Sequence, residues 1–139
     1  MKELIMNSIL KSVILSIAIL AGSSTYARNE SSDVFVPITK YLAQGNAEAL
    51  SAWFSENLDI SVLSPERNCS RNQAELILET FFNAHTPRSF EITHTAGRAN
   101  KKYALGNLNA GGETFLVTIF VSSKGGTFSI QQLKIERRD

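Results

Sequence analysis

The chain has 139 residues, of which 43% are hydrophobic and 19% are charged, and its 14 basic side chains nearly balance 13 acidic ones. This composition is typical of one soluble globular domain, and it argues against a disordered tail or a membrane bundle. The formal net charge of +1 also argues against a nucleic-acid partner, because phosphate contacts need a concentrated basic surface.

Residues 1–27 have the pattern of a secretory signal peptide. Lys2 and Lys11 precede the apolar run SVILSIAILA, and the small residues Thr25 and Ala27 suit a cut after Ala27. The run is short for a bilayer span, so an uncleaved membrane anchor is the weaker alternative. We therefore expect a signal peptide at 1–27 and one domain at 28–139, exported to the periplasm or secreted, with no stable membrane span after cleavage.

The single cysteine, Cys69, limits the covalent chemistry of the chain. It lies far from the expected cleavage site, which excludes a lipoprotein, and one cysteine cannot form an internal disulfide. Cys69 stands directly before a helix-capping pattern, where a small apolar residue packs against the first turn. We interpret it as a structural residue, with a reactive thiol or an intermolecular link as the alternative.

The first half of the domain has helical periodicity. Residues 33–44 place apolar side chains on one stripe and end at Gly45, a residue that suits a helix C-terminus. Asn46 is the expected N-cap of a second helix, and a short strand is expected at 60–63. Ser70 and Gln73 form a capping-box pattern that starts the third helix. The expected stripes are Val34, Ile38, Tyr41 and Leu42; then Leu50, Trp53, Phe54 and Leu58; then Ala74, Ile77, Leu78, Phe81 and Phe82.

The second half alternates with a period of two, which predicts strands. The segments 89–95, 102–108, 114–121 and 128–136 are separated by glycine-containing turns, so we expect a four-stranded antiparallel meander. The apolar positions change phase near residues 106–107 and 131–132, and an extra residue at each place would restore a constant core face. Such bulges increase strand twist, which predicts a strongly curved sheet.

This order of elements resembles the nuclear-transport-factor-2-like superfamily. More narrowly, the segments 33–54, 59–82 and 90–100 are similar to a family of small exported bacterial proteins known only as a domain of unknown function. The resemblance implies an α+β fold with three N-terminal helices packed on a curved antiparallel sheet, the cone also called cystatin-like. It implies no catalytic residues, and the superfamily contains both enzymes and non-enzymatic modules.

The residues themselves argue against catalysis. A ketosteroid-isomerase-like reaction needs a carboxylate base and donors aimed into the cavity. The expected inner face carries His94 among apolar residues such as Tyr103 and Leu105, and it has no Asp or Glu. Asp59 could be a base, but an Asp at the start of a strand is more often a turn former. The separated His85 and His94, without a close carboxylate pair, lack the spacing of a zinc site, and no phosphate loop or nucleophile motif is present. We expect no catalytic residue, metal or cofactor, with an isomerase or dehydratase built around His94 as the alternative.

Two sets of residues are candidates for binding. Tyr41, Trp53, Tyr103 and His94 could contact a small apolar or amphipathic ligand, although each also fits a core stripe. Leu116 and Phe120 alternate with the inward residues of their strand and should therefore point away from the helices. They predict a homodimer through the outer sheet face. The sequence favours a non-catalytic ligand-binding or interaction module, with a structural subunit of an envelope assembly as the alternative.

Overall fold

The computed structural model describes residues 34–138, so the expected signal peptide lies outside the described residues. None of the helices in this range is long and apolar enough to cross a membrane. The helices are α2 (Phe35–Gln44), α3 (Ala47–Ser51) and α4 (Arg71–Ala84). The strands are β1 (Phe54–Val62), β2 (Arg67–Ser70), β3 (Pro87–Arg98), β4 (Lys101–Ala110), β5 (Glu113–Lys124) and β6 (Thr127–Arg137).

The turn between α2 and α3 forms as the sequence predicts. Gly45 ends α2 in the left-handed region, with φ of 67°, which glycine adopts at little cost. Asn46 caps α3, since its side chain accepts a hydrogen bond of 3.0 Å from the Ala49 amide. Pro37 is compatible with α2 because it lies in the first turn, where its missing N–H would have no partner inside the helix.

The second helix is much shorter than its apolar spacing predicts. It ends at Ser51, and Phe54 and Leu58 belong instead to β1. The Trp53 carbonyl accepts a hydrogen bond of 2.6 Å from the Ile130 amide of β6, so the chain pairs with the sheet at this point. The helical interpretation of residues 53–58 is therefore wrong, because pairing with a distant strand outweighs a local pattern.

The third predicted helix, α4, is confirmed with its cap. The Ser70 hydroxyl accepts from the Gln73 amide, and the Gln73 side chain accepts from the Ser70 amide, both at 3.2 Å. The predicted apolar stripe faces the core: Ala74, Leu78, Phe81 and Phe82 are buried, and Ile77 is half-buried. Phe81 packs edge-on against Phe115 of β5, with ring centroids 5.1 Å apart.

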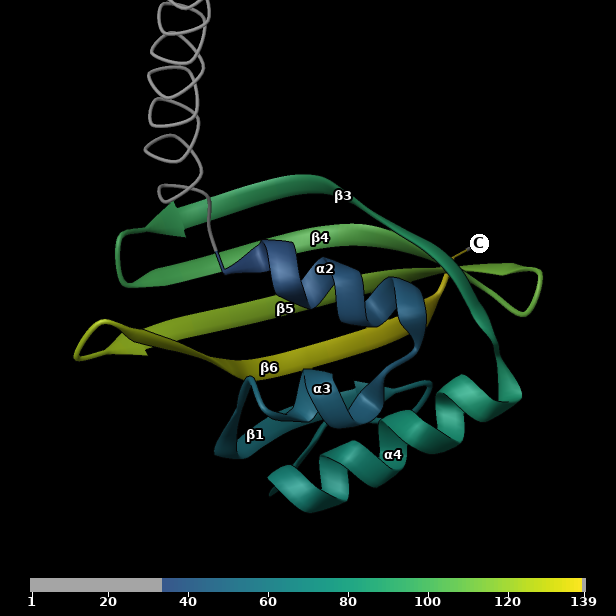
Figure 1. Cartoon of the computed structure of the whole chain (residues 1–139), viewed down its shortest axis with the longest axis horizontal. Helices are drawn as coiled ribbons and strands as arrows, with labels where there is room; N and C mark the ends of the chain where they lie inside the picture. Colours follow the sequence, from purple (N-terminus) through teal and green to yellow (C-terminus); the bar gives the residue numbers. More distant parts are fainter. Residues whose placement is uncertain (1–33, 139) are drawn as a thin grey trace, which may run out of the picture. The chain divides into compact units, whose positions relative to one another are not determined.

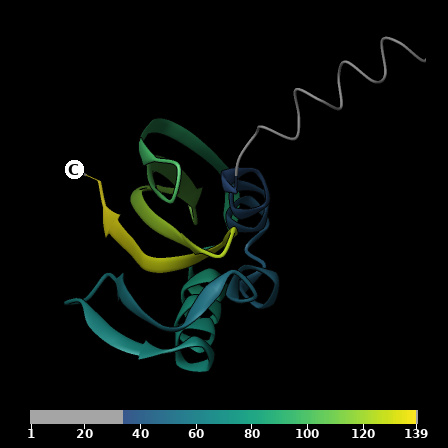
Figure 2. The same ribbon diagram turned by 90° about the vertical axis from the view of Figure 1, so that its left-hand side faces the viewer.

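The sheet has six strands in the order β2-β1-β6-β5-β4-β3 (Figure 1). Strands β3 to β6 form the expected antiparallel meander, but β1 joins β6 in parallel and β2 pairs with β1. The sheet is therefore mixed rather than wholly antiparallel, and the expected strand at 60–63 is the second half of β1. Figure 2 shows the sheet curving around the three described helices, which lie on its concave side.

The strand pairing shifts register at four places: once between β1 and β6, at Arg88 and at Thr93 of β3, and at Gln131 of β6. The pairing of β5 with β6 moves from Phe120 with Gln132 to Val121 with Ile130, so Gln131 is an extra residue, as predicted. The second predicted bulge, near residues 106–107 of β4, is absent, because β4 pairs with β5 without a break. The pairing of β3 with β4 leaves Thr93 unpaired opposite an unbroken β4, and the inner face of β4 is formed by Ala104, Gly106, Leu108 and Ala110.

Gly106 forms a notch in the inner face that the ring of Phe90 fills. A Cβ atom at residue 106 would lie 2.5 Å from a ring carbon of Phe90 and 2.7 Å from the Glu91 carbonyl oxygen. Phe90 is buried and belongs to the same core as Phe115 and Val117. The glycine therefore leaves room for a large aromatic ring on the inner face of β4 while β3 stays paired beside it.

We predict that Gly106→Ala destabilises the domain by about 1–3 kcal/mol, because the added methyl group overpacks a filled core and meets backbone as well as side chain. Urea unfolding followed by circular dichroism measures this. Asn107→Ala, on the opposite face of the same strand, is the control and should change the free energy of unfolding much less. Equal stability of Gly106→Ala and the wild type would contradict the notch.

Candidate functional site

The outer face of the sheet, turned away from α2, α3 and α4, carries a cluster of large apolar side chains. Tyr103 of β4 pairs directly with Phe120 of β5, and Leu105 and Leu116 are on the same face of these strands. All four are half-buried. No helix of the described residues covers them (Figure 2). We call Tyr103, Leu105, Leu116 and Phe120 the outer cluster.

Leu116 and Phe120 lie where the sequence predicts. Their strand neighbours Phe115, Val117, Ile119 and Val121 are fully buried on the helix side. Leu108 is also buried, because it continues the inner row of β4 and not because β4 has a bulge. The prediction of a second apolar face on β5 is thus confirmed, while the contact that covers it stays a prediction.

His94 is on the outer face, contrary to the expectation that it faces the core. The unpaired Thr93 reverses the alternation of β3, so that His94 pairs with Leu105. Its ring lies 6.4 Å from that of Tyr103, edge to face at 75°, and its side chain is exposed. Tyr103 and Leu105 are likewise outer residues, because Ala104 and Gly106 occupy the inner positions of β4.

The four predicted ligand-binding residues do not form one site. His94 and Tyr103 lie together on the outer face, whereas Tyr41 and Trp53 lie against the core on the helix side. Tyr41 is half-buried on α2 with the Lys40 ammonium 5.8 Å from its ring centre. Any ligand that touches Tyr103 and His94 would therefore leave Tyr41 and Trp53 on the other side of the sheet.

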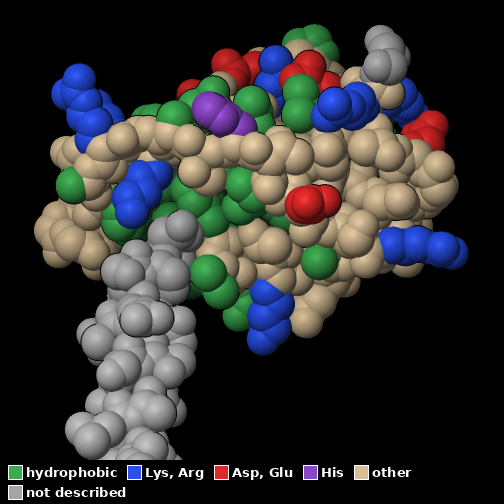
Figure 3. Space-filling view, turned by 90° about the horizontal axis from the view of Figure 1, so that it is seen from above, with side chains coloured by type: hydrophobic (Ala, Val, Ile, Leu, Met, Phe, Trp, Pro, Cys, Tyr) green, Lys and Arg blue, Asp and Glu red, His purple; other side chains and the backbone are tan. Residues whose placement is uncertain are grey.

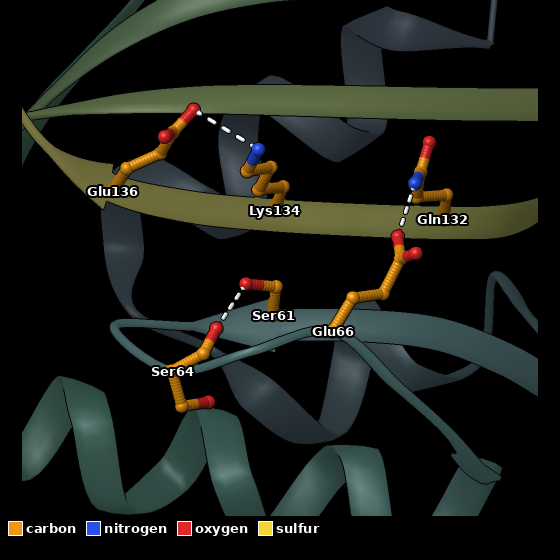
Figure 4. A network of polar contacts seen from close by, with 6 residues as sticks. All are labelled: Ser61, Ser64, Glu66, Gln132, Lys134 and Glu136. Atoms are coloured by element: carbon orange, nitrogen blue, oxygen red, sulfur yellow. Dashed lines mark hydrogen bonds and ion pairs between the residues drawn. The ribbon is translucent and has the colours of Figure 1, made fainter.

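Polar side chains border the outer cluster on β6 and β1 (Figure 4). Lys134 and Glu136 form an ion pair of 3.7 Å, and Gln132 donates a hydrogen bond to Glu66, which follows β1. Of these residues, Gln132, Lys134 and Glu136 of β6 pair across the sheet with Phe120, Thr118 and Leu116 of β5. The apolar cluster therefore has a polar border along β6.

A pocket opens at one end of the outer cluster, where β3 turns into β4. Its volume is about 490 Å³, and it is lined by Gly97, Arg98, Asn100, Lys101, Lys102, Tyr103 and Phe120. Gly97 has φ of 128°, and a Cβ atom there would lie 2.2 Å from the Lys101 carbonyl oxygen. Only glycine allows the two strands to approach so closely, and this approach shapes the pocket wall. Sequence reasoning missed Arg98 and Lys101, although the acid-free run from 92 to 112 is visible in the sequence.

The other pockets offer less chemistry. An acidic pocket of about 440 Å³ at the α2–α3 turn contains Glu75, whose carboxylate accepts a hydrogen bond of 2.7 Å from Ser51. A mainly apolar pocket of about 330 Å³ lies between α4 and the end of β1. No group of three potential metal ligands occurs within residues 34–138.

Cys69 is buried at the start of α4, in agreement with a structural role. Burial raises the pKa of the Cys69 thiol; Arg67 lowers it by a smaller amount, and Asp59 adds a small further rise. The thiolate, which is the reactive form, is therefore less populated at neutral pH than in a free cysteine.

We predict that the Cys69 thiol reacts with a disulfide reagent at least about tenfold more slowly than a cysteine in an unfolded peptide, because both burial and the raised pKa oppose thiolate formation. The rate should rise with pH along a profile displaced to higher pH. Absorbance of the released thiolate measures it, and the urea-unfolded protein is the control. A reaction as fast as that of the unfolded chain would contradict a structural cysteine.

The outer position of His94 leads to a prediction about stability. Because its side chain is exposed, His94→Gln should change the free energy of unfolding by no more than about 0.5 kcal/mol, as usual for surface substitutions. Thermal unfolding measures this, with Phe90→Leu on the inner face of the same strand as the destabilised comparison. A loss of several kcal/mol in His94→Gln would place the imidazole in the core after all.

Three helices on the concave face of a curved mixed sheet form an α+β fold, and solved structures described as NTF2-like and cystatin-like share it. A crystal structure of an NTF2-like protein of unknown function from Cytophaga hutchinsonii has a TM-score of 0.56 at 14% identity, covering 76% of this chain and 88% of that one. A domain of unknown function with a cystatin-like fold from Nostoc punctiforme has a TM-score of 0.60 at 14% identity, covering 74% of this chain and 72% of that one.

The chain belongs to the family described as Domain of unknown function (DUF4783), which residues 35–136 match. A crystal structure of a DUF4783 family protein from Bacteroides uniformis has a TM-score of 0.73 at 21% identity, covering 77% of this chain and 99% of that one. No curated protein matches the chain. At such identities the likeness to solved structures shows the fold alone, so the function must be argued from the site.

Proposed function

We propose that this protein is an exported, non-catalytic interaction module in which two copies associate through the outer face of the sheet. The observation that carries the proposal is the outer cluster, in which four large apolar side chains lie together on a face that no described helix covers. Contiguous apolar surface of this kind marks interaction sites more often than free surface.

The surroundings of the outer cluster support a contact with protein. The ion pair Lys134–Glu136 and the Gln132–Glu66 hydrogen bond form a polar border on one side, and exposed His94 lies on the other. An apolar centre with a polar rim is the usual anatomy of a protein interface. A twofold contact uses the same patch on both copies, so one apolar face is sufficient.

Catalysis by His94 has less support than association. Within the described residues, no hydrogen bond or ion pair joins the imidazole to a carboxylate that could orient it, and its side chain is exposed to water. A general base works best in a pocket that tunes its pKa and excludes solvent. The exposed imidazole therefore favours a role at the rim of a contact.

We predict that Phe120→Glu weakens self-association about thirtyfold or more. The substitution places an unpaired charge inside an apolar contact, which costs about 2 kcal/mol or more of binding free energy. Sedimentation velocity at micromolar concentration measures this. Leu76→Glu is the matched control, since Leu76 is 62% exposed on α4, away from the sheet. Circular dichroism confirms that both variants fold.

A wild-type protein that sediments as a monomer, or a dimer that is unaffected by Phe120→Glu, would overturn the proposed association. A dimer weakened equally by Leu76→Glu would place the contact on α4 instead.

Export makes a separate prediction. The protein recovered from the host envelope or medium should begin at Arg28, because Thr25 and Ala27 fit the specificity of the signal peptidase. Intact-mass spectrometry measures the N-terminus. Recovery of the exported protein with Met1 in place would show that the segment is a retained anchor.

A further inference from the structure

We propose that the pocket at the β3–β4 end of the outer face binds a small amphipathic anion, with its acidic headgroup between Arg98 and Lys101 and its apolar body on Tyr103 and Phe120. All the residues of this site come from one chain, but Tyr103 and Phe120 also belong to the outer cluster, so a bound ligand and a second copy would compete for these two rings.

The end of the sheet that holds the β3–β4 turn is rich in basic side chains and poor in acidic ones. Between Ile92 and Ile135 the only acidic residue is Glu113. Glu113 and Lys124 are the first and last residues of β5, so the carboxylate lies about 35 Å away along the strand. Figure 3 shows Lys and Arg side chains, with no Asp or Glu in view, at the end of the domain that holds the two hairpins.

The cations of the pocket are free to meet a ligand. Within residues 34–138, neither Arg98 nor Lys101 forms an ion pair, since the ion pairs found there involve His85, Lys134 and Arg137. Arg98 and Lys101 pair across the hairpin on the outer side. Lys102 is on the inner side, where its ammonium lies 5.2 Å from the ring centre of Phe128.

Contact between the β3–β4 hairpin and the β5–β6 hairpin fixes the position of these charges. The Ser123 amide donates a hydrogen bond of 2.8 Å to the Asn100 carbonyl, which joins the β3–β4 turn to the end of β5. Lys124 follows directly and adds a further positive charge nearby. Gly97 keeps β3 and β4 in contact at the pocket wall. The walls of the pocket are therefore formed by hydrogen-bonded strand ends of the sheet.

The floor of the pocket suits an apolar ligand body. Tyr103 and Phe120 are direct cross-strand neighbours, so their rings form one apolar surface beside the cations. A volume of about 490 Å³ is within the range of small-molecule sites, which are mostly apolar with a few polar anchors. A guanidinium, an ammonium and an aromatic floor together suit a carboxylate, sulfate or phosphate carried on an apolar body.

The test uses decanoate as the probe and decyl glucoside, which has a similar tail and no charge, as the control ligand. In the purified protein, decanoate below its micelle concentration should shift amide resonances of residues 97–103 and Phe120. The neutral analogue should bind about tenfold more weakly, because it lacks the charged hydrogen bonds. Raised salt should weaken decanoate binding.

The variant Arg98→Gln with Lys101→Gln should reduce decanoate affinity about tenfold or more. Arg88→Gln with Lys40→Gln is the matched control, because it removes one exposed arginine at the start of β3 and one exposed lysine on α2, both away from the pocket and the outer cluster, and it should leave binding unchanged. Sedimentation of both double variants is measured alongside, so that loss of ligand binding is distinguished from loss of association.

Co-sedimentation with phosphatidylglycerol vesicles, compared with phosphatidylcholine vesicles, separates the two sources of such an anion. Binding to phosphatidylglycerol alone, lost in Arg98→Gln with Lys101→Gln, would assign the site to a lipid headgroup, and decanoate binding would assign it to a free amphiphile. Binding of neither probe, equal binding of decanoate and decyl glucoside, or equal loss of affinity in both double variants would overturn the proposal.

Discussion

The unpaired residues Thr93 and Gln131 decide which side chains of the sheet meet the helices. A strand alternates strictly, so one extra residue exchanges its two faces from that point onward. In β6 this brings Ile130, Leu133 and Ile135 to the same buried side despite their broken spacing. In β3 the extra residue Thr93 separates two side chains that simple alternation would place on one face: Phe90 enters the core, and His94 lies on the outer side. The buried face of β6 and the outer surface that carries the candidate site therefore both depend on these extra residues.

Much of the fold could be predicted because its signals are local. The capping box of Ser70 and Gln73, the Gly45 C-cap and the bulge at Gln131 each follow from a few neighbouring residues. The strand at residues 54–58 could not, since its spacing also fits a helix and its partner, β6, is distant in sequence. In β4 the large residues Tyr103 and Leu105 suggested the wrong face, because the true inner face contains the small residues Ala104 and Gly106. The glycine at residue 106 is explained by the Phe90 ring beside it, which only the three-dimensional structure reveals.

The candidate site divides in a similar way. Leu116 and Phe120 could be found by alternation alone, because β5 keeps its register from end to end on the β4 side. The pocket beside them depends on how two hairpins meet, and no local pattern reports that contact. Tyr41 and Trp53 have the amphipathic character of ligand contacts, yet the fold uses them against its core. Residue type therefore indicated what could bind, whereas register decided which residues share a surface.

The bulge at Thr93 also matters for how the protein behaves when it is concentrated. Strand β3 is twelve residues long and is an edge of the sheet, so one side of its backbone is open to pairing with strands of other molecules. A regular edge of this length promotes uncontrolled sheet growth. The irregularity at Thr93 interrupts the row of donors and acceptors near its middle, and Pro87 removes an amide at its start. The residue that turns His94 outward is therefore also expected to make the open edge of β3 a poorer template for strand pairing.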